Sequence, residues 1–291
     1  MMVVLSLAHP MNRYLTPFRW FGLAIATAVV MLLITVGVPS NSTAQTPSGT
    51  ELLWYGQSAY KITTPSGKVL LVDPWITNPL NPNGEEDLAN LDPVDLILVT
   101  HGHGDHVGNA IAIAQATQAN LVSTADLGQA LISGGYPEEL YGRDTRGNFG
   151  GEISLLDDEV KVAFIPAVHS SAIGTDGNPA AYAGNPGGFL ISVADGPVIY
   201  HTGDTDLFTD MSLVSQFREV DVMLTCIGDQ YTMGPERAAE AVKLVHPTLA
   251  IPMHYGVFTL TGTPEEFASA LDTLNVDTQL KVMEPGETLM L

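Results

Sequence analysis

The chain has 291 residues, of which 45% are hydrophobic, and it carries a net charge of −21 at neutral pH. This length supports one large domain or at most two small ones. Its acidic surface repels polyanions, so nucleic acid is a poor candidate partner. The single cysteine, Cys226, cannot form an internal disulfide, and it lies in an apolar run where a buried thiol is expected.

The first 44 residues are predicted to lie outside the folded domain. Arg13 and Arg19 precede an uncharged apolar stretch over 20–38, and a polar segment with small residues follows it up to Ala44. This order is typical of an export signal cleaved after Ala44. The apolar stretch is also nearly long enough to act as an uncleaved membrane anchor. We therefore expect the domain over 45–291 to be exported to the periplasm or the cell exterior, either free or tethered to the membrane through 20–38.

Short apolar runs bounded by turn residues predict a series of strands, and segments with helical spacing follow several of them. Strands are predicted at 52–55, 59–64, 68–72, 94–100, 160–165, 188–193, 198–201, 221–227, 249–253, 280–283 and 288–291, with a strand–helix unit over 120–133. Further helices are predicted at 106–117, 207–217, 235–245 and 264–274, and loops at 77–93, 141–151 and 170–186.

The order of these elements predicts the fold class. Proline stands at the first position of the last two helices, and Thr263 and Glu266 are spaced as a capping box. Strands come first and strand–helix units follow, twice along the chain. We therefore expect an α/β fold of four layers, an αββα sandwich in which two mixed sheets pack face to face with helices outside.

Residues 101–106, His-Gly-His-Gly-Asp-His, are the most informative segment. They follow a predicted buried strand, and in an extended stretch His101 and His103 can face one point because alternate side chains point the same way. Asp105 and His106 then begin the next helix. This geometry offers two nitrogens to one metal ion, and a carboxylate with a third nitrogen to a second ion about 3.5–4 Å away. The alternative is a histidine-rich surface turn.

Three more candidate ligands lie downstream, each where a predicted strand ends: His169, Asp204 and His254. Functional groups concentrate at such strand ends in α/β folds. Because imidazole nitrogens and carboxylate oxygens are ligands of zinc and other divalent first-row ions, two divalent ions are expected. Zinc is favoured, with manganese, iron and nickel as alternatives.

The motif H-x-H-x-D-H at 101–106, with the three later ligands in order, resembles the metallo-β-lactamase superfamily of metal-dependent hydrolases. The resemblance covers essentially all of 51–291. Segments 227–235 and 253–256 are similar to a branch related to ascorbate-6-phosphate lactonase. The resemblance implies a first ion bound by His101, His103 and His169, a second bound by Asp105, His106 and His254, and Asp204 bridging the two.

This resemblance and the ligand chemistry predict an enzyme. A hydroxide that bridges the two ions is expected to attack a small ester, lactone or related substrate, with Asp105 as the candidate proton shuttle to the leaving group. The alternatives are a phosphodiesterase, including one for lipid-type substrates, and a non-catalytic or redox metal-binding module on the same fold.

Several other residues have two interpretations. Gln57 stands where many relatives have a histidine, so it bears on substrate contact or on the surroundings of the ligands. Asp73 either orients a metal-bound histidine or caps a turn. Asp229 and His201 are either site residues or structural ones. Arg143 and Arg146 either clamp an anion or lie in a solvated loop. Two tyrosines, Tyr231 and Tyr255, are candidate donors to a substrate oxygen, and the loop over 171–186 is a candidate lid.

Overall fold

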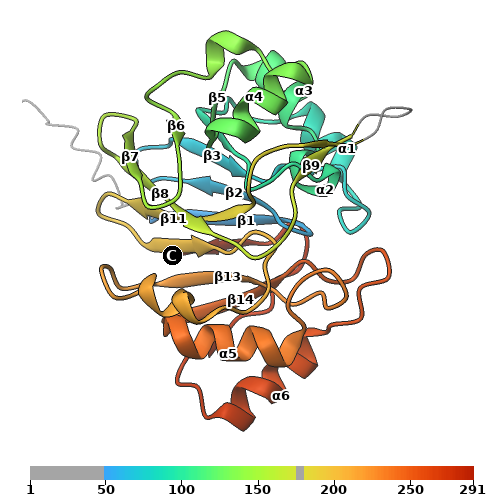
Figure 1. Cartoon of the computed structure of the whole chain (residues 1–291), viewed down its shortest axis with the longest axis vertical. Coiled ribbons are helices and arrows are strands. Elements are labelled where there is room, and N and C mark those ends of the chain that lie inside the picture. Colours follow the sequence, from blue (N-terminus) through green and yellow to red (C-terminus); the bar gives the residue numbers. More distant parts are fainter. Residues whose placement is uncertain (1–48, 175–179) are drawn as a thin grey trace, which may run out of the picture. The chain divides into compact units, whose positions relative to one another are not determined.

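Two seven-stranded sheets pack face to face at the centre of the folded part of the chain, as the sequence predicts (Figure 1). The computed structural model describes residues 49–174 and 180–291. The predicted leader, residues 1–44, lies outside the described residues. No helix within the described residues is long and apolar enough to cross a membrane.

The first sheet is antiparallel on one side and parallel on the other. Its strand order is β16 (Thr288–Met290), β1 (Glu51–Gly56), β2 (Ala59–Thr63), β3 (Val69–Val72), β4 (Leu96–Leu98), β5 (Asn120–Thr124) and β6 (Arg146–Gly147). The pairs from β16 to β3 are antiparallel, and those from β3 to β6 are parallel.

The second sheet has the same mixed character. Its order is β15 (Gln279–Leu280), β14 (Leu249–Met253), β13 (Val222–Cys226), β12 (Val198–His201), β11 (Gly187–Val193), β8 (Val160–Pro166) and β7 (Glu152–Leu155). The strands from β12 to β15 are parallel, so their carboxyl ends meet at one edge of the sheet. Polar side chains that follow such ends are brought close together.

Helices cover the outer faces of both sheets (Figure 1). The elements are α1 (Gly84–Ala89), α2 (Gly104–Val107), α3 (Ala110–Thr117), α4 (Ala125–Ser133), α5 (Pro235–Val245) and α6 (Pro264–Leu274), with short 3-10 helices η1 (Glu138–Leu140) and η2 (Thr209–Leu213). The α3 and α4 helices pack on the first sheet, and α5 and α6 lie over the second (Figure 1).

Alternation along the strands explains this layering. In β3, Leu70 and Val72 belong to the core between the sheets, whereas Leu71 packs toward the helices outside. In β4, Leu96 and Leu98 face inward and Ile97 faces outward in the same way. Because both faces are buried, these strands appear in the sequence as continuous apolar runs.

Some predicted elements are wrong in extent or type. The predicted helix over 106–117 is divided at Gly108, which has φ +42°. The chain turns sharply at this residue. A side chain there would place its Cβ 2.4 Å from the Trp75 Cα, so only glycine fits. The predicted helix over 207–217 contains only the 3-10 helix η2. Its Thr, Asp, Ser and Val residues are weak helix formers.

The structure also contains elements that the sequence patterns did not indicate. The predicted loop over 77–93 includes α1, whose first turn is acidic and which buries only Gly84. The edge strand β7 pairs with β8. The predicted loop over 170–186 contains a two-stranded pair, β9 (Ala172–Ile173) and β10 (Ala181–Tyr182).

Candidate metal centre

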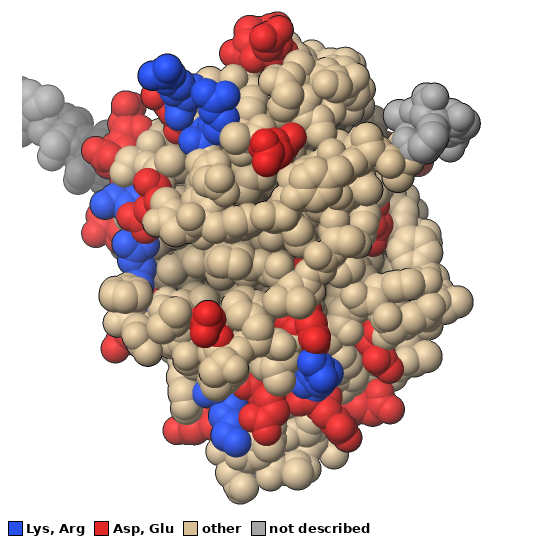
Figure 2. Space-filling model, in the orientation of Figure 1, with Lys and Arg blue, Asp and Glu red and all other residues tan. Residues whose placement is uncertain are grey.

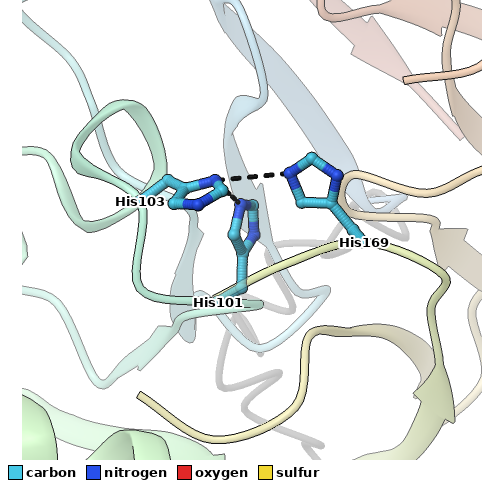
Figure 3. Close-up of side chains that lie close together, drawn as sticks. All are labelled: His101, His103 and His169. Carbon is cyan, nitrogen blue, oxygen red and sulfur yellow. Dashed lines mark hydrogen bonds between the residues drawn. The ribbon is translucent and has the colours of Figure 1, made fainter. Parts of the chain in front are cut away.

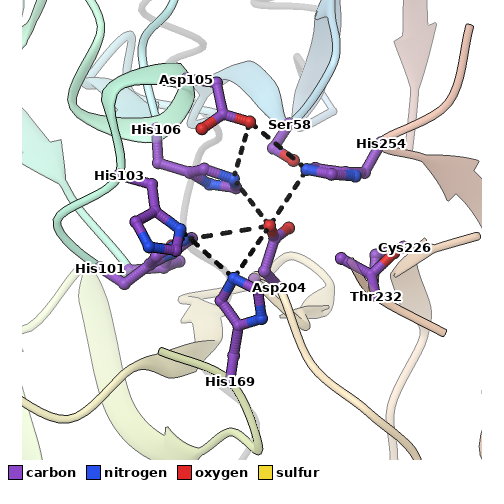
Figure 4. Close-up of polar contacts among 12 residues, drawn as sticks. Ser58, His101, His103, Asp105, His106, His169, Asp204, Cys226, Thr232 and His254 are labelled. Carbon is purple, nitrogen blue, oxygen red and sulfur yellow. Dashed lines mark hydrogen bonds and ion pairs between the residues drawn. The ribbon is translucent and has the colours of Figure 1, made fainter. Parts of the chain in front are cut away.

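All seven predicted ligands lie together at one edge of the sheets (Figure 4). The loop and helix after β4 supply four of them, and the segments that follow β8, β12 and β14 supply one each. They form two groups, and within each group the potential ligand atoms lie within 4.8 Å of one another. The groups are His101, His103 and His169, here called the three-histidine cluster, and Asp105, His106, Asp204 and His254, here called the mixed cluster.

In the three-histidine cluster, one nitrogen of each ring points to a common centre (Figure 3). The Nδ1 atom of His103 lies 3.0 Å from His101 Nε2 and 3.3 Å from His169 Nε2. Two nitrogens that bind the same tetrahedral zinc ion, each about 2.05 Å away, are separated by roughly 3.3 Å. The spacing of these three nitrogens therefore fits a shared divalent ion.

The mixed cluster is more deeply buried and contains unsatisfied polar atoms. The Oδ1 atom of Asp204 is buried without a hydrogen-bond partner among the described residues, and the Nε2 atoms of His106 and His254 lie beside carboxylate oxygens without hydrogen-bond geometry. Leaving such atoms unpaired costs free energy unless another group binds them. A divalent ion would satisfy these nitrogen and oxygen donors together, so the cluster also fits a metal ion.

Asp204, a member of the mixed cluster, also lies close to the three-histidine cluster. Its Oδ2 atom is 3.0 Å from His254 Nε2, 3.3 Å from His106 Nε2, 3.6 Å from His169 Nε2 and 3.9 Å from His101 Nε2. The backbone of the neighbouring loop is fixed by a hydrogen bond from Val168 N to Thr205 Oγ1 (3.0 Å) and by another from Asp206 N to Val168 O (3.0 Å). These two bonds connect the loop that carries His169 to the loop that carries Asp204.

A buried carboxylate outside the clusters orients one ligand of the mixed cluster. His106 Nδ1 donates a hydrogen bond to Asp73 Oδ2 at 2.7 Å, and both side chains are fully buried. With one hydrogen held on Nδ1, the ring binds a metal ion through Nε2 once that ion replaces the second ring proton. Asp73 therefore orients a candidate ligand, which is the first of its two predicted interpretations.

Asp73 also acts on the three-histidine cluster through Thr100. The Thr100 hydroxyl donates to Asp73 Oδ2 at 2.7 Å, and the Thr100 backbone N–H donates to Asp73 Oδ1 at 2.8 Å. Because the single hydroxyl hydrogen is used, Thr100 Oγ1 accepts from His101 Nδ1, 3.0 Å away. His101 consequently presents a free Nε2.

The histidine pKa values shift in opposite directions in the two clusters. Burial lowers the pKa of His101, His103 and His169, and the nearby carboxylates oppose this only in part, so these rings remain neutral and able to bind a metal. Burial also lowers the pKa of His254, but the carboxylates of Asp204 and Asp105 outweigh it and raise the pKa to about 9.

The same balance acts on the other members of the mixed cluster. Burial lowers the pKa of His106, yet the surrounding carboxylates raise it overall. Burial raises the pKa of Asp105 and Asp204, but the adjacent imidazolium groups hold the pKa of both carboxyls below its usual range. Protons therefore supply positive charge where a bound cation would supply it.

The other sequence candidates lie outside both clusters. His201 uses both ring nitrogens structurally, since Nε2 is 3.0 Å from Ser58 O and Nδ1 accepts from Gly203 N at 3.1 Å. Asp229 accepts from the Thr261 hydroxyl at 3.2 Å in a turn. Arg146 lies over the ring of Tyr141, at 5.9 Å from its centroid.

Among the described residues, the remaining candidates other than Gln57 form no hydrogen bond or ion pair with a member of either cluster. Tyr255 packs against Trp54, with ring centroids 5.7 Å apart. Tyr231 is exposed, and Arg143 is exposed in its loop. Gln57, whose role the sequence left open, contacts a ligand directly: its Nε2 donates to Asp105 Oδ2 at 3.2 Å.

Basic side chains are absent from the described contacts of both clusters. Acidic groups outnumber basic ones on the face shown in Figure 2. Among the described residues, six Lys or Arg side chains pair with surface carboxylates, namely Lys61, Lys68, Arg218, Arg237, Lys243 and Lys281. None of these ion pairs includes a member of either cluster.

The four-layer sandwich and the convergent His and Asp side chains at its edge define a metal-dependent hydrolase of the metallo-β-lactamase fold. The chain belongs to the β-lactamase superfamily, since residues 68–255 match the family described as "Beta-lactamase superfamily domain". This family membership confirms the resemblance that the H-x-H-x-D-H motif predicted.

Known proteins resemble this chain over most of its length. A UPF0173 metal-dependent hydrolase of Thermodesulfovibrio yellowstonii is 52% identical over 265 residues, which cover 90% of this chain and 98% of that protein. The solved structure of Igni18, a metallo hydrolase of Ignicoccus hospitalis, has a TM-score of 0.72 and 33% identity, and the match covers 83% of this chain and 98% of that one. The Bacillus subtilis metallo-β-lactamase fold protein YhfI, with a TM-score of 0.60 and 14% identity, shows the same fold over 83% of this chain and 99% of its own.

Proposed function

We propose that this hydrolase uses a centre of two divalent ions, zinc in preference to manganese, iron or nickel, to cleave a small neutral ester or lactone. The observation that carries the proposal is the position of Asp204 Oδ2, within 4 Å of histidine nitrogens from both clusters. A carboxylate in this position can bridge two ions. The three-histidine cluster offers only nitrogen donors and the mixed cluster offers two imidazole nitrogens with two carboxylates, and this composition favours zinc.

Each residue then has a defined task. The first ion would be bound by His101, His103 and His169, the second by Asp105, His106 and His254, and both by Asp204. When bound, such ions lower the pKa of coordinated water and polarise the oxygen under attack. Asp73 and Thr100 keep the ligating nitrogens free of hydrogen, as their hydrogen bonds to His106 and His101 indicate.

Asp105 is suited to transfer a proton to the leaving group. Its side chain is 19% exposed, whereas that of Asp204 is 4% exposed, so Asp105 is the more accessible carboxylate of the mixed cluster. A substrate that reaches the cluster from solvent would meet Asp105 before Asp204. A carboxylate there can accept a proton from the nucleophile and return it to the departing oxygen.

The surrounding charge favours a neutral substrate over a phosphodiester. Phosphate recognition ordinarily uses Arg or Lys side chains, and none of the described basic residues pairs with either cluster. The strongly acidic surface also opposes the approach of anions. These features support an ester or lactone as the substrate.

The test combines metal analysis with a substrate panel. The purified protein is loaded with zinc, its metal content is measured, and it is assayed with aliphatic lactones, aryl esters, phosphodiesters and β-lactams. We expect two ions per chain and the highest kcat/KM with lactones or esters. Fewer than two ions, or preferential cleavage of phosphodiesters, would contradict the proposal.

We further propose that the chain is exported, on the evidence of the basic, apolar and small-residue order of residues 1–44. Cell fractionation with N-terminal sequencing tests this. A mature chain that begins at Gln45 is expected for a cleaved signal, and a membrane-bound chain that retains 20–38 is expected for an anchor. Recovery of the full-length protein in the cytoplasmic fraction would contradict export.

A further inference from the structure

Gln57 occupies a strained position beside the mixed cluster. It follows β1 in the tight turn to β2, where Gly56 pairs with Ala59, and it adopts φ +52°. This left-handed region favours Gly, Asn and Asp, and other side chains adopt it uncommonly. The residue is also fully buried. A buried glutamine in such a conformation needs a reason other than turn formation.

The side chain of Gln57 contacts one member of the mixed cluster. Its Nε2 donates to Asp105 Oδ2 at 3.2 Å. The same oxygen lies 3.5 Å from His254 Nε2 and 3.7 Å from His106 Nε2, so it is the oxygen that faces the cluster. The reverse amide orientation would place two acceptors against each other, and it is therefore disfavoured.

The backbone of Gln57 contacts a second member. Its carbonyl oxygen accepts from the His254 backbone N–H at 3.2 Å and from Trp54 Nε1 at 3.1 Å. His254 itself adopts φ +57°. Gln57 thus connects Asp105, which follows β4 of the first sheet, to His254, which follows β14 of the second sheet.

Stability alone does not account for this side chain. The Oε1 atom of Gln57 is buried and has no hydrogen-bond partner among the described residues. An unsatisfied buried acceptor and a left-handed backbone both disfavour glutamine here. The favourable contact of the Gln57 side chain is its hydrogen bond to Asp105.

We infer that Gln57 is a positioning residue for the second metal ion: its amide fixes the Asp105 carboxylate while its carbonyl fixes the backbone of His254. This inference rests on the proposed two-metal function. Partners of metal ligands commonly change metal affinity by 10–100-fold when they are removed. The loss of the Gln57 amide should therefore weaken the second ion and leave the first unchanged.

Cobalt titration of the full domain tests the inference, with visible absorption and calorimetry as readouts. The variants are Gln57→Leu, which removes the donor, and Gln57→Asn, which suits the positive φ but is too short to reach Asp105. A third variant, His103→Ala, removes a ligand of the three-histidine cluster and so assigns the two binding steps. The control is Asn78→Leu, because Asn78 is a buried amide whose hydrogen bonds within the described residues go to backbone groups of Tyr55, Trp75 and Leu80.

For both Gln57 variants we expect the Kd of the second ion to rise about 10–100-fold, with a changed cobalt spectrum for that ion alone. The Tm of the metal-free Gln57→Asn protein should be equal or higher, since its backbone strain is relieved. Asn78→Leu should lower the Tm without changing the ratio of the two Kd values.

Three outcomes separate the possible failures. If the unmodified protein binds fewer than two cobalt ions, the proposed two-metal function fails, and the inference fails with it. If the unmodified protein binds two ions and the Gln57 variants bind the second equally well, only the inference is overturned. A fall in the Tm with both Kd values raised equally would show a merely structural role.

Discussion

Asp73 Oδ2 lies 2.7 Å from His106 Nδ1, and neither side chain is exposed to solvent. The same carboxylate accepts from the backbone N–H and the hydroxyl of Thr100, so its two oxygens accept three hydrogen bonds in all. One buried carboxylate thereby sets the hydrogen position on His106 directly and on His101 through Thr100. The two candidate metal clusters consequently share a common support.

The Asp73→Asn variant should lose both metal affinity and stability. An amide nitrogen would oppose one of the three donors, and the loss of a charge-assisted hydrogen bond costs about 1–3 kcal/mol. We expect the affinity for zinc to fall about 10–100-fold, as measured by competition with a chelator. Asp95→Asn is the control, because Asp95 accepts from Val69 N at 2.9 Å and precedes β4, whereas the ligands follow the other end of that strand. Equal zinc affinity in both variants would contradict the role of Asp73.

The hydroxyl of Thr100 provides a narrower test. Thr100→Val keeps the shape of a side chain that is only 2% exposed but removes the acceptor for His101 Nδ1. We expect the first ion to bind about 10-fold more weakly and kcat to fall with it. Thr100→Ser keeps the hydroxyl and should restore both values. If the valine and serine variants bind zinc alike, the hydrogen bond to His101 has no effect on the site.

Sequence patterns predicted the regular elements between residues 235 and 274 well, whereas the strand predicted at 280–283 is the shorter β15, Gln279–Leu280. The α5 and α6 helices and β14 have their predicted bounds. Proline at the first helical position marks the start of both helices. The capping box also forms, with Thr263 Oγ1 accepting from Glu266 N at 3.2 Å. The division at Gly108 was missed because it depends on the nearby backbone of Trp75, a tertiary contact that helical spacing does not encode.

The same distinction applies to the site. The spacing of residues 101–106 and the strand ends predicted seven side chains that the structure brings together. The groups that orient them come from distant parts of the chain: Asp73 reaches a partner 33 residues away, and Gln57 reaches one 48 residues away. Such pairings depend on strand register and turn conformation, and a local motif therefore left their roles open.

Asp105→Asn tests proton transfer separately from metal binding. The amide can still approach the second ion but cannot carry a proton as a carboxylate does. With metal content verified at two ions per chain, we expect kcat to fall on the order of 10²–10⁴-fold. Asp206→Asn is the control, since Asp206 forms an exposed pair with Arg237 outside the clusters. An unchanged kcat with both ions present would remove Asp105 from the reaction.

The stability of the metal-free protein should depend on pH through His254. Its pKa is raised to about 9 in the folded protein, compared with about 6.5 in an unfolded chain. A raised histidine pKa means that the folded state binds the proton more tightly. The resulting stabilisation is fully present below pH 6.5 and is lost as the pH rises through 9.

Thermal unfolding in a chelator should therefore show a Tm that falls from pH 6.5 to pH 9, corresponding to a free-energy loss on the order of a few kcal/mol. His106, whose pKa is also raised, acts in the same direction. With zinc bound, the ion replaces these protons as the positive charge beside Asp204, so the Tm should change little over this range. His246→Gln is the control, because His246 is the C-cap residue that follows α5, outside both clusters. Parallel pH profiles with and without zinc would show that the imidazoles of the mixed cluster do not exchange protons for a metal ion.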